Sequence, residues 1–129
     1  MAVDSIFNKY KPLVHSYLSN FFKEQSNRFK HIPIWSEDVF KKLEHFSCQG
    51  KMVRACHLLF AANLGRAHIS GQDALKAAAA LEIIHSSLLI HDDIIDRDLL
   101  RRGEKTIFAQ YQELAENENL KDSYHFGES

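Results

Sequence analysis

The sequence lacks an excess of charge of either sign, and it has few cysteines. Its 129 residues carry 16 basic and 17 acidic side chains, which gives a formal net charge of −1. No overall field therefore recruits nucleic acid or an anionic membrane, and any recognition of phosphate must be local. Cys48 and Cys56 are the only cysteines, and they lack the spacing of metal ligands. Reduced thiols in a cytoplasmic protein are therefore expected, rather than a disulfide or a zinc site.

The sequence also lacks a signal peptide and a long uninterrupted apolar run. The N-terminus, "MAVDSIFNKYKPLV", has no basic region followed by an apolar stretch. The apolar run near Ala77 is interrupted by Glu82 and His85, so no transmembrane segment is expected. Strand-like alternation, internal repeats and low-complexity segments are absent as well. With 45% hydrophobic residues, the chain is predicted to form one all-α domain with a core.

Apolar residues recur at helical spacing along most of the chain. The predicted helices cover residues 5–29, 36–50, 51–63, 70–96 and 106–115, with a last helical start at "SYHFGES". The segment 70–96 is the strongest, because Ser70 to Asp73 can cap it and because alanine and leucine favour a helix throughout. It is apolar nearly all round, which predicts that it is buried.

The end of this helix, "LLIHDDIIDRDLLRRGEKT", gathers several carboxylates. Asp92 and Asp96 stand four residues apart, so on a helix they share a face and repel each other. Magnesium would offset that cost, since it is commonly held by one or two carboxylates and by substrate phosphates. Asp93 lies about 100° round the helix and would support this pair. The alternative is a solvated helix end, although acidic residues there oppose the helix dipole.

Arginines follow the carboxylates. Arg101 would point to the opposite side if the helix continued, so the chain must turn, and Gly103 provides a permissive point. Arg101 and Arg102 could then fold back toward the carboxylates and bind a metal-bound phosphate. The alternative for both arginines is a surface salt bridge to Asp98 or Glu104, which would contribute little.

A second cationic segment, "GKMVR", lies upstream. It places Lys51 and Arg54 on one helical face just after Gly50, where free amides at a helix start also attract anions. A solvated Lys/Arg pair is the alternative interpretation. His85 lies two turns before Asp92 on the same helical face, where a packed core histidine is the alternative to a ligand contact.

The segments "GKMVR", "EIIHSSLLIHDDIID" and "RRG", in this order and spacing, resemble the N-terminal half of the trans-polyprenyl diphosphate synthases. "DDIID" matches the first aspartate-rich DDxxD motif, and the resemblance runs from Lys11 to Ser129. It implies an enzyme that condenses isopentenyl diphosphate with an allylic diphosphate, with magnesium as cofactor. It also implies an all-α isoprenoid synthase bundle of which residues 1–129 are a truncated N-terminal part. Family members are usually more than twice as long, and no second DDxxD motif follows here.

The resemblance implies a role for each matched residue. Asp92 and Asp96 would hold magnesium, with Asp93 in the supporting place, and Arg101 would bind the allylic diphosphate. The positions that match the isopentenyl diphosphate site are Lys51, Arg54, His85 and Arg102. The family's usual GGKRxRP is altered at three other positions, where Gly, Arg and Pro are replaced by Gln49, Met52 and Ala55.

The resemblance also bears on product length, which the family sets by side chains just before the aspartates. Large aromatics there go with short products, and these positions here are Ser87 and Leu88, with Ile84 one turn deeper. We therefore expect a product of geranylgeranyl length or longer from the complete enzyme, which would be a homodimer, and no turnover by residues 1–129 alone.

Three alternatives stay open at the level of the sequence. A non-catalytic partner subunit of a prenyl synthase would be expected to lose the aspartates or arginines, which are intact here. A terpene cyclase would share DDxxD but would have no reason to carry both "GKMVR" and "RRG". An all-α interaction module with solvated charges would need four matched elements to coincide.

Overall fold

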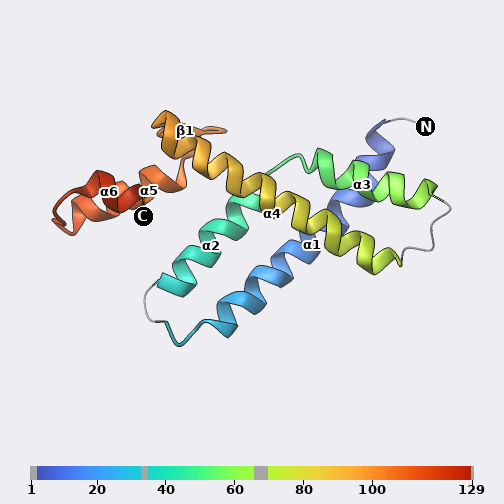
Figure 1. The fold of residues 1–129 in the computed structure, drawn as a ribbon, viewed down its shortest axis with the longest axis horizontal. Helices are drawn as coiled ribbons and strands as arrows, with labels where there is room; N and C mark the ends of the chain where they lie inside the picture. Colours follow the sequence, from blue (N-terminus) through green and yellow to red (C-terminus); the bar gives the residue numbers. More distant parts are fainter. Residues whose placement is uncertain (1–2, 33–34, 66–69, 129) are drawn as a thin grey trace. The chain divides into compact units, whose positions relative to one another are not determined.

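Helices make up nearly all of the fold. The computed structural model describes residues 3–32, 35–65 and 70–128. In chain order its elements are α1 (Val3–Arg28), α2 (Trp35–Cys48), α3 (Val53–Leu64), α4 (Gly71–Asp96), β1 (Leu100–Arg101), β2 (Glu104–Lys105), α5 (Ile107–Asn117) and α6 (Ser123–Glu128) (Figure 1). The all-α prediction is confirmed. The short β1–β2 hairpin was not predicted, because strands of two residues are too short to show an alternating pattern.

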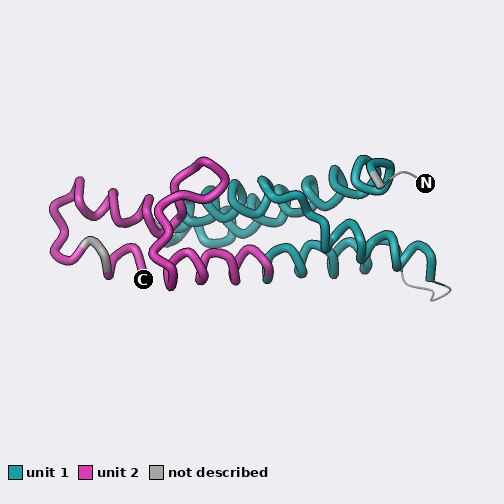
Figure 2. The backbone as a smooth tube through the Cα atoms, turned by 90° about the horizontal axis from the view of Figure 1, so that it is seen from above, with its two compact units in different colours: residues 1–84 teal, residues 85–129 magenta. Residues whose placement is uncertain are grey.

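The chain divides into two compact units, residues 1–84 and 85–129, and the division falls within α4 (Figure 2). The first unit is built on α1, which packs against α2 and α3. Its core combines side chains from α1, from α3 and the residue before it, and from the first half of α4. The buried members are Tyr10, Val14, Leu18, Phe22, Met52, Ala55, Cys56, Leu59, Ala74, Ala78 and Ala79.

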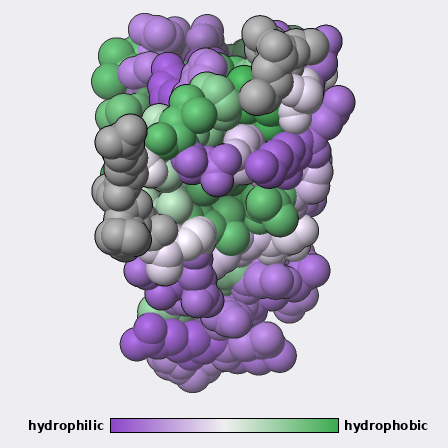
Figure 3. Space-filling view, turned by 90° about the vertical axis from the view of Figure 1, so that its right-hand side faces the viewer, coloured by the Kyte–Doolittle hydropathy of each residue, from purple (hydrophilic) through white to green (hydrophobic). Residues whose placement is uncertain are grey.

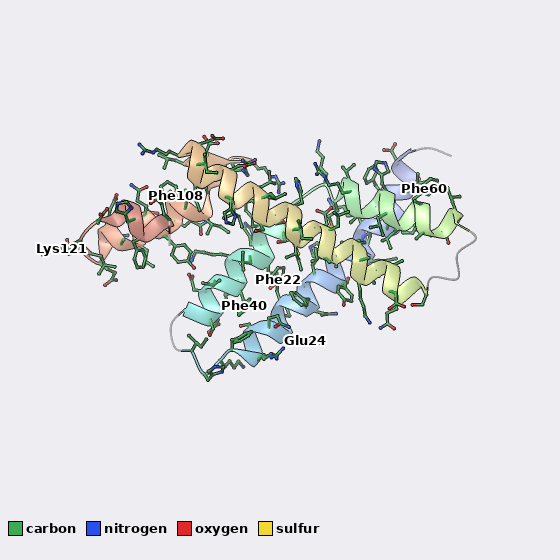
Figure 4. The ribbon with its side chains drawn as sticks, in the orientation of Figure 1. Phe22, Glu24, Phe40, Phe60, Phe108 and Lys121 are labelled. Carbon is green, nitrogen blue, oxygen red and sulfur yellow. The ribbon has the colours of Figure 1, made fainter. Side chains whose placement is uncertain are left out.

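The buried face of α1 follows from its sequence spacing. Tyr10, Val14, Leu18 and Phe22 recur every four residues and are all buried, as the periodicity predicted. Phe40 of α2 packs against this cluster (Figure 4). Burying large side chains at this regular spacing is what holds α1 in the first unit.

Helix α4 begins as the sequence predicted. The amide of Asp73 donates to Oγ of Ser70 at 3.0 Å, and that hydroxyl donates to Oδ2 of Asp73 at 2.7 Å. A side chain that accepts from a first-turn amide satisfies one of the donors that a helix start leaves open. The cap at Ser70 is therefore confirmed.

The prediction that α4 is buried all round is wrong. Ile84, Leu88 and Ile95 are 58%, 59% and 76% exposed, so one side of the helix is uncovered.

Helix α4 is long enough and apolar enough to cross a membrane. Core helices of soluble proteins also meet these two criteria, so they are weak evidence for a span. Glu82 and His85 are thus too few to exclude a span by composition, contrary to the expectation from the sequence.

Apolar side chains also reach the surface of the first unit. Figure 3 shows them between polar residues on the side that it presents, and Leu13 and Leu64 are both at least half exposed. Leu13 lines a pocket of about 390 Å³ together with Leu59 and Leu75. None of the described residues that line this pocket is charged.

In the second unit, α6 packs closely against α5. Phe108 of α5 is 1% exposed, and Gly127 of α6 lies directly against it. A Cβ atom at Gly127 would meet Cδ2 and the carbonyl oxygen of Phe108, both at 2.9 Å. The two helices can approach this closely only because residue 127 has no side chain.

We expect Gly127→Ala to destabilise the second unit by about 1–3 kcal/mol, because the added methyl overpacks against backbone that cannot yield. Faster amide hydrogen exchange in α6 would report the loss. Gly71→Ala is the matched control, since nothing lies within 4 Å of a Cβ there. Equal exchange rates in α6 for both variants would contradict the close packing.

Candidate functional site

The chain reverses direction directly after α4. Arg97 adopts a left-handed conformation with φ 58°, and the amide of Asp98 donates to the carbonyl oxygen of Asp93 at 2.9 Å. These two features end the helix and start the return of the chain. The turn that the arginines require is therefore present.

A two-residue turn completes the reversal. β1 and β2 pair antiparallel, with Leu100 opposite Lys105 and Arg101 opposite Glu104. Arg102 and Gly103 connect them with φ 53° and 81°, and positive φ at both positions is typical of tight hairpin turns. The prediction of a turn at Gly103 is confirmed.

Thr106, the residue before α5, connects the loop after α4 to the start of α5. Thr106 is 1% exposed, and its hydroxyl donates to the carbonyl oxygen of Asp98 at 2.7 Å. The hydroxyl oxygen of Thr106 also accepts from the amide of Ala109 at 3.1 Å and so caps α5. One buried side chain thus joins the loop after α4 to the next helix.

The reversal brings Arg101 back onto α4. Its Nε and Nη2 atoms donate to Oδ1 of Asp93 at 2.7 and 2.6 Å. The side chain of Asp93 is 2% exposed and that of Arg101 is 28% exposed. The arginine therefore folds back as predicted, but the ion pair is made with Asp93 and not with Asp98 or Glu104, the two partners considered from the sequence.

Only one of the two carboxylate oxygens of Asp93 accepts a hydrogen bond. Both arginine donors reach Oδ1, and Oδ2 is the one buried side-chain oxygen or nitrogen without a hydrogen-bond partner in the part of the chain that the structure describes. Such an atom costs about 1–3 kcal/mol, and in native proteins it marks a place where a further partner is expected.

Neighbouring carboxylates keep Arg101 charged. Its hydrogen bond to Asp93 raises the pKa of the guanidinium above the ordinary value, partial burial opposes this, and the negative charges of Asp93, Asp98 and Asp92 raise it further. A raised arginine pKa stabilises the fold at every pH below the ordinary value and loses that effect only above it. Arg101 is consequently a permanent cation beside the aspartates.

Asp92 and Asp96 are exposed, in contrast to the buried Asp93. Being four residues apart on α4, they lie about 6 Å apart on one face. No group of three or more potential ligands surrounds a common point in the described residues, so these carboxylates form no all-protein cage. Two carboxylates plus phosphate oxygens are, however, the ligands that magnesium takes, and the unsatisfied Oδ2 of Asp93 lies on the next residue. The donor set therefore fits magnesium.

The residues predicted to set product length lie on the uncovered side of α4. Ile84, Ser87 and Leu88 are all exposed, and a ring nitrogen of His91 lies 2.8 Å from the carbonyl oxygen of Ser87. His85 is partly buried. An open apolar strip thus leads along the helix to the aspartates.

The second cationic segment belongs to the first unit, at the start of α3. Lys51 and Arg54 are exposed, and Met52 between them is buried with φ 55°. The amide of Ala55 donates to Oε1 of Glu82 at 3.2 Å. The expectation that free amides at this helix start attract an anion is therefore wrong for Ala55, whose amide is already bonded.

Glu82 is the residue of this site that the sequence interpretation missed. It is 4% exposed on α4, and its partner lies 27 residues away in the sequence. A lone glutamate inside an apolar helix is the available signal, but the sequence shows it only as an interruption of the apolar run. Sequence spacing shows which face such a residue takes but not which helix it meets.

The two thiols do not supply an alternative chemistry. Both cysteines are free. Burial, assisted by the negative charge of Glu44, raises the pKa of Cys48 to about 11. Burial also raises the pKa of Cys56, to which the charge of Glu82 adds. A thiol is nucleophilic as the thiolate, so neither cysteine is activated at neutral pH.

Comparisons with known proteins identify the family that the chain resembles. The family model described as polyprenyl synthetase matches residues 37–117. The chain is 38% identical over 104 residues to the geranylgeranyl diphosphate synthase of Saccharolobus solfataricus, covering 74% of this chain and 30% of the relative. It is 36% identical over 116 residues to a short chain isoprenyl diphosphate synthase of Methanothermobacter thermautotrophicus, covering 88% and 32%.

A farnesyl diphosphate synthase of Buchnera aphidicola is 28% identical over 107 residues, covering 81% of this chain and 36% of that protein. The chain therefore spans about a third of the length of the curated relatives it matches. No solved structure matches it.

Proposed function

Because this chain belongs to the polyprenyl synthetase family, we propose that it is the N-terminal part of a prenyltransferase domain that holds both substrates by their diphosphates. The reaction would join isopentenyl diphosphate to an allylic diphosphate. The proposal includes a homodimeric enzyme, as the resemblance implies, and a cytoplasmic location, which was expected from the two cysteines. Residues 1–129 would contribute the first aspartate-rich motif and the cations that surround it.

One observation carries the proposal. Asp92 and Asp96 are exposed together at the end of α4, and the hairpin returns Arg101 to the aspartate between them. A diphosphate needs both features, since its oxygens can share a metal ion with carboxylates and accept hydrogen bonds from a guanidinium. A solvated helix end would not require a buried ion pair behind it.

In this proposal Asp92 and Asp96 would hold magnesium. The ion would neutralise the charge that develops on pyrophosphate as the allylic carbon–oxygen bond breaks. Arg101 would donate to the same pyrophosphate oxygens with the donors that Asp93 leaves free, because a guanidinium has five. Asp93 would hold that guanidinium in place.

Lys51 and Arg54 would bind the diphosphate of isopentenyl diphosphate, with His85 and Arg102 in the same group. Their contribution is positioning, since a fixed acceptor meets the allylic carbon without a further loss of entropy. The double bond of the acceptor forms the new carbon–carbon bond, and the released pyrophosphate takes the proton that the product loses. The apolar side chains along α4 would keep water from the allylic carbocation that forms when the carbon–oxygen bond breaks.

We expect residues 1–129 alone to give no prenyl transfer, because the chain has one aspartate-rich motif and about a third of the relatives' length. A chimera tests the function itself: residues 1–129 would replace the matching segment of the Saccharolobus solfataricus synthase, to which they are 38% identical over 104 residues. Magnesium-dependent formation of a longer prenyl diphosphate is expected from the chimera. A folded chimera without activity would contradict the proposal, and turnover by the chain alone would contradict its incompleteness.

The product is proposed to be of geranylgeranyl length or longer. Ser87→Phe in the active chimera should shorten it, because an aromatic ring would fill the strip along which the chain grows. Chromatography of the dephosphorylated products measures the distribution. Ser87→Ala is the control, since it keeps the position small. An unchanged distribution in Ser87→Phe would mean that the prenyl tail does not pass this residue.

A further inference from the structure

Glu82 is a buried carboxylate to which the proposed reaction gives no task. It is 4% exposed on α4, and the amide of Ala55 donates to its Oε1 at 3.2 Å. Burying a carboxylate is costly unless it is paired or hydrogen-bonded. Its presence in an otherwise apolar stretch of helix therefore indicates a specific role at the start of α3.

The start of α3 lacks a cap of its own. The residue before its first turn, Met52, has no side-chain hydrogen bond and a left-handed φ of 55°, and the first turn contains no acidic residue. A helix start leaves amides without partners and carries a partial positive charge. Glu82 supplies from α4 both the acceptor and the negative charge that this turn lacks.

The amide of Ala55 makes this cap possible. It lies in the first turn of α3, where helix amides have no partner within the helix. An acceptor from another element, such as Glu82, can therefore hold the turn. Proline at this position would remove the donor.

This turn carries the two cations of the proposed isopentenyl diphosphate site. Lys51 precedes it and Arg54 belongs to it, and both are exposed. We infer that Glu82 is a positioning residue that caps α3 from α4 and thereby fixes the turn that presents Lys51 and Arg54 to one diphosphate. The inference rests on the proposed function of these two cations. Glu82 itself is buried and acts through the backbone.

Titration calorimetry of the 129-residue chain with inorganic pyrophosphate tests this. Glu82→Leu should weaken binding roughly tenfold, which is the size of one lost orienting hydrogen bond. It should also speed hydrogen exchange at the amide of Ala55. Glu82→Gln keeps an acceptor and should stay within about threefold of the wild type, because only the charge at the helix start is lost.

Two controls separate positioning from folding. Leu59→Ala removes a buried side chain of α3 without touching the cap, so it should lower stability and leave the affinity of the folded chain unchanged. Ala55→Pro removes the amide donor. In that background Glu82→Leu should cost no further affinity, because no donor remains for Glu82 to hold.

The outcomes distinguish the two proposals. Binding that depends on Lys51 but is unchanged by Glu82→Leu overturns the positioning role alone. A loss in Glu82→Leu that Leu59→Ala reproduces, or that persists in the Ala55→Pro background, overturns it as well. Pyrophosphate binding that is absent from the wild type, or indifferent to Lys51→Ala, overturns the proposed function of this turn and the inference together.

Discussion

Replacing Arg101 with alanine should destabilise the second unit by about 3 kcal/mol, the low end of the range for breaking a buried ion pair. The reason lies in Asp93, whose side chain is 2% exposed and would be left without a hydrogen-bond partner for either oxygen. Partial exposure of Arg101 lets some water enter, which keeps the loss at this lower end. Chemical denaturation of the chain measures it.

A double variant and an exposed pair serve as controls. Asp93→Asn in the Arg101→Ala background should recover part of the loss, because a neutral amide is less costly to bury. Lys105→Ala breaks an ion pair with Glu113 that is about half exposed on both sides, so it should cost well under 1 kcal/mol. An Arg101→Ala chain as stable as Lys105→Ala would show that the pair does not hold the hairpin.

Unlike Arg101→Ala, Asp92→Ala should lower turnover strongly and leave stability almost unchanged. In the active chimera it should lower turnover by about 10²–10³-fold, since a magnesium ligand contributes several kcal/mol of transition-state stabilisation. Stability should stay constant or rise by a few tenths of a kcal/mol, because the change removes a like-charge neighbour of Asp96. Steady-state kinetics and thermal unfolding of the same samples measure both quantities.

The control for Asp92→Ala is Glu113→Ala, which removes an exposed carboxylate of the same unit. Glu113→Ala should leave turnover unchanged. If Asp92→Ala unfolded the protein while its folded fraction kept full activity, the carboxylate would be structural, and the magnesium assignment would be wrong.

The contrast between Asp92 and Asp93 shows which features of the site could be predicted from the sequence. Helical spacing predicted that these neighbours take different faces, and Asp93 is indeed buried while Asp92 is exposed. The need for a turn before Arg101 could also be predicted, because a continuing helix would have carried it away. Spacing could not select Asp93 as the partner of Arg101, since that depends on how the hairpin docks.

The same limit explains the errors at α4. Its composition predicted burial on all sides, but composition does not say how many helices are available to cover it, and Leu88 and Ile95 are exposed. The bond from Ala55 to Glu82 joins two helices across 27 residues, and no local pattern encodes such a contact. Periodicity predicted the helices, while the pairing of polar groups between them required the structure.

The most direct test of the central claim is calorimetric titration of the 129-residue chain with an allylic diphosphate, with and without magnesium. Beside any binding at Lys51 and Arg54, the account predicts a separate binding step that requires magnesium and that is lost in the Asp92→Ala and Asp96→Ala variants, both of which stay folded. A titration in which magnesium adds no such step, or in which the step persists in either variant, would contradict the claim that these two aspartates form a diphosphate site.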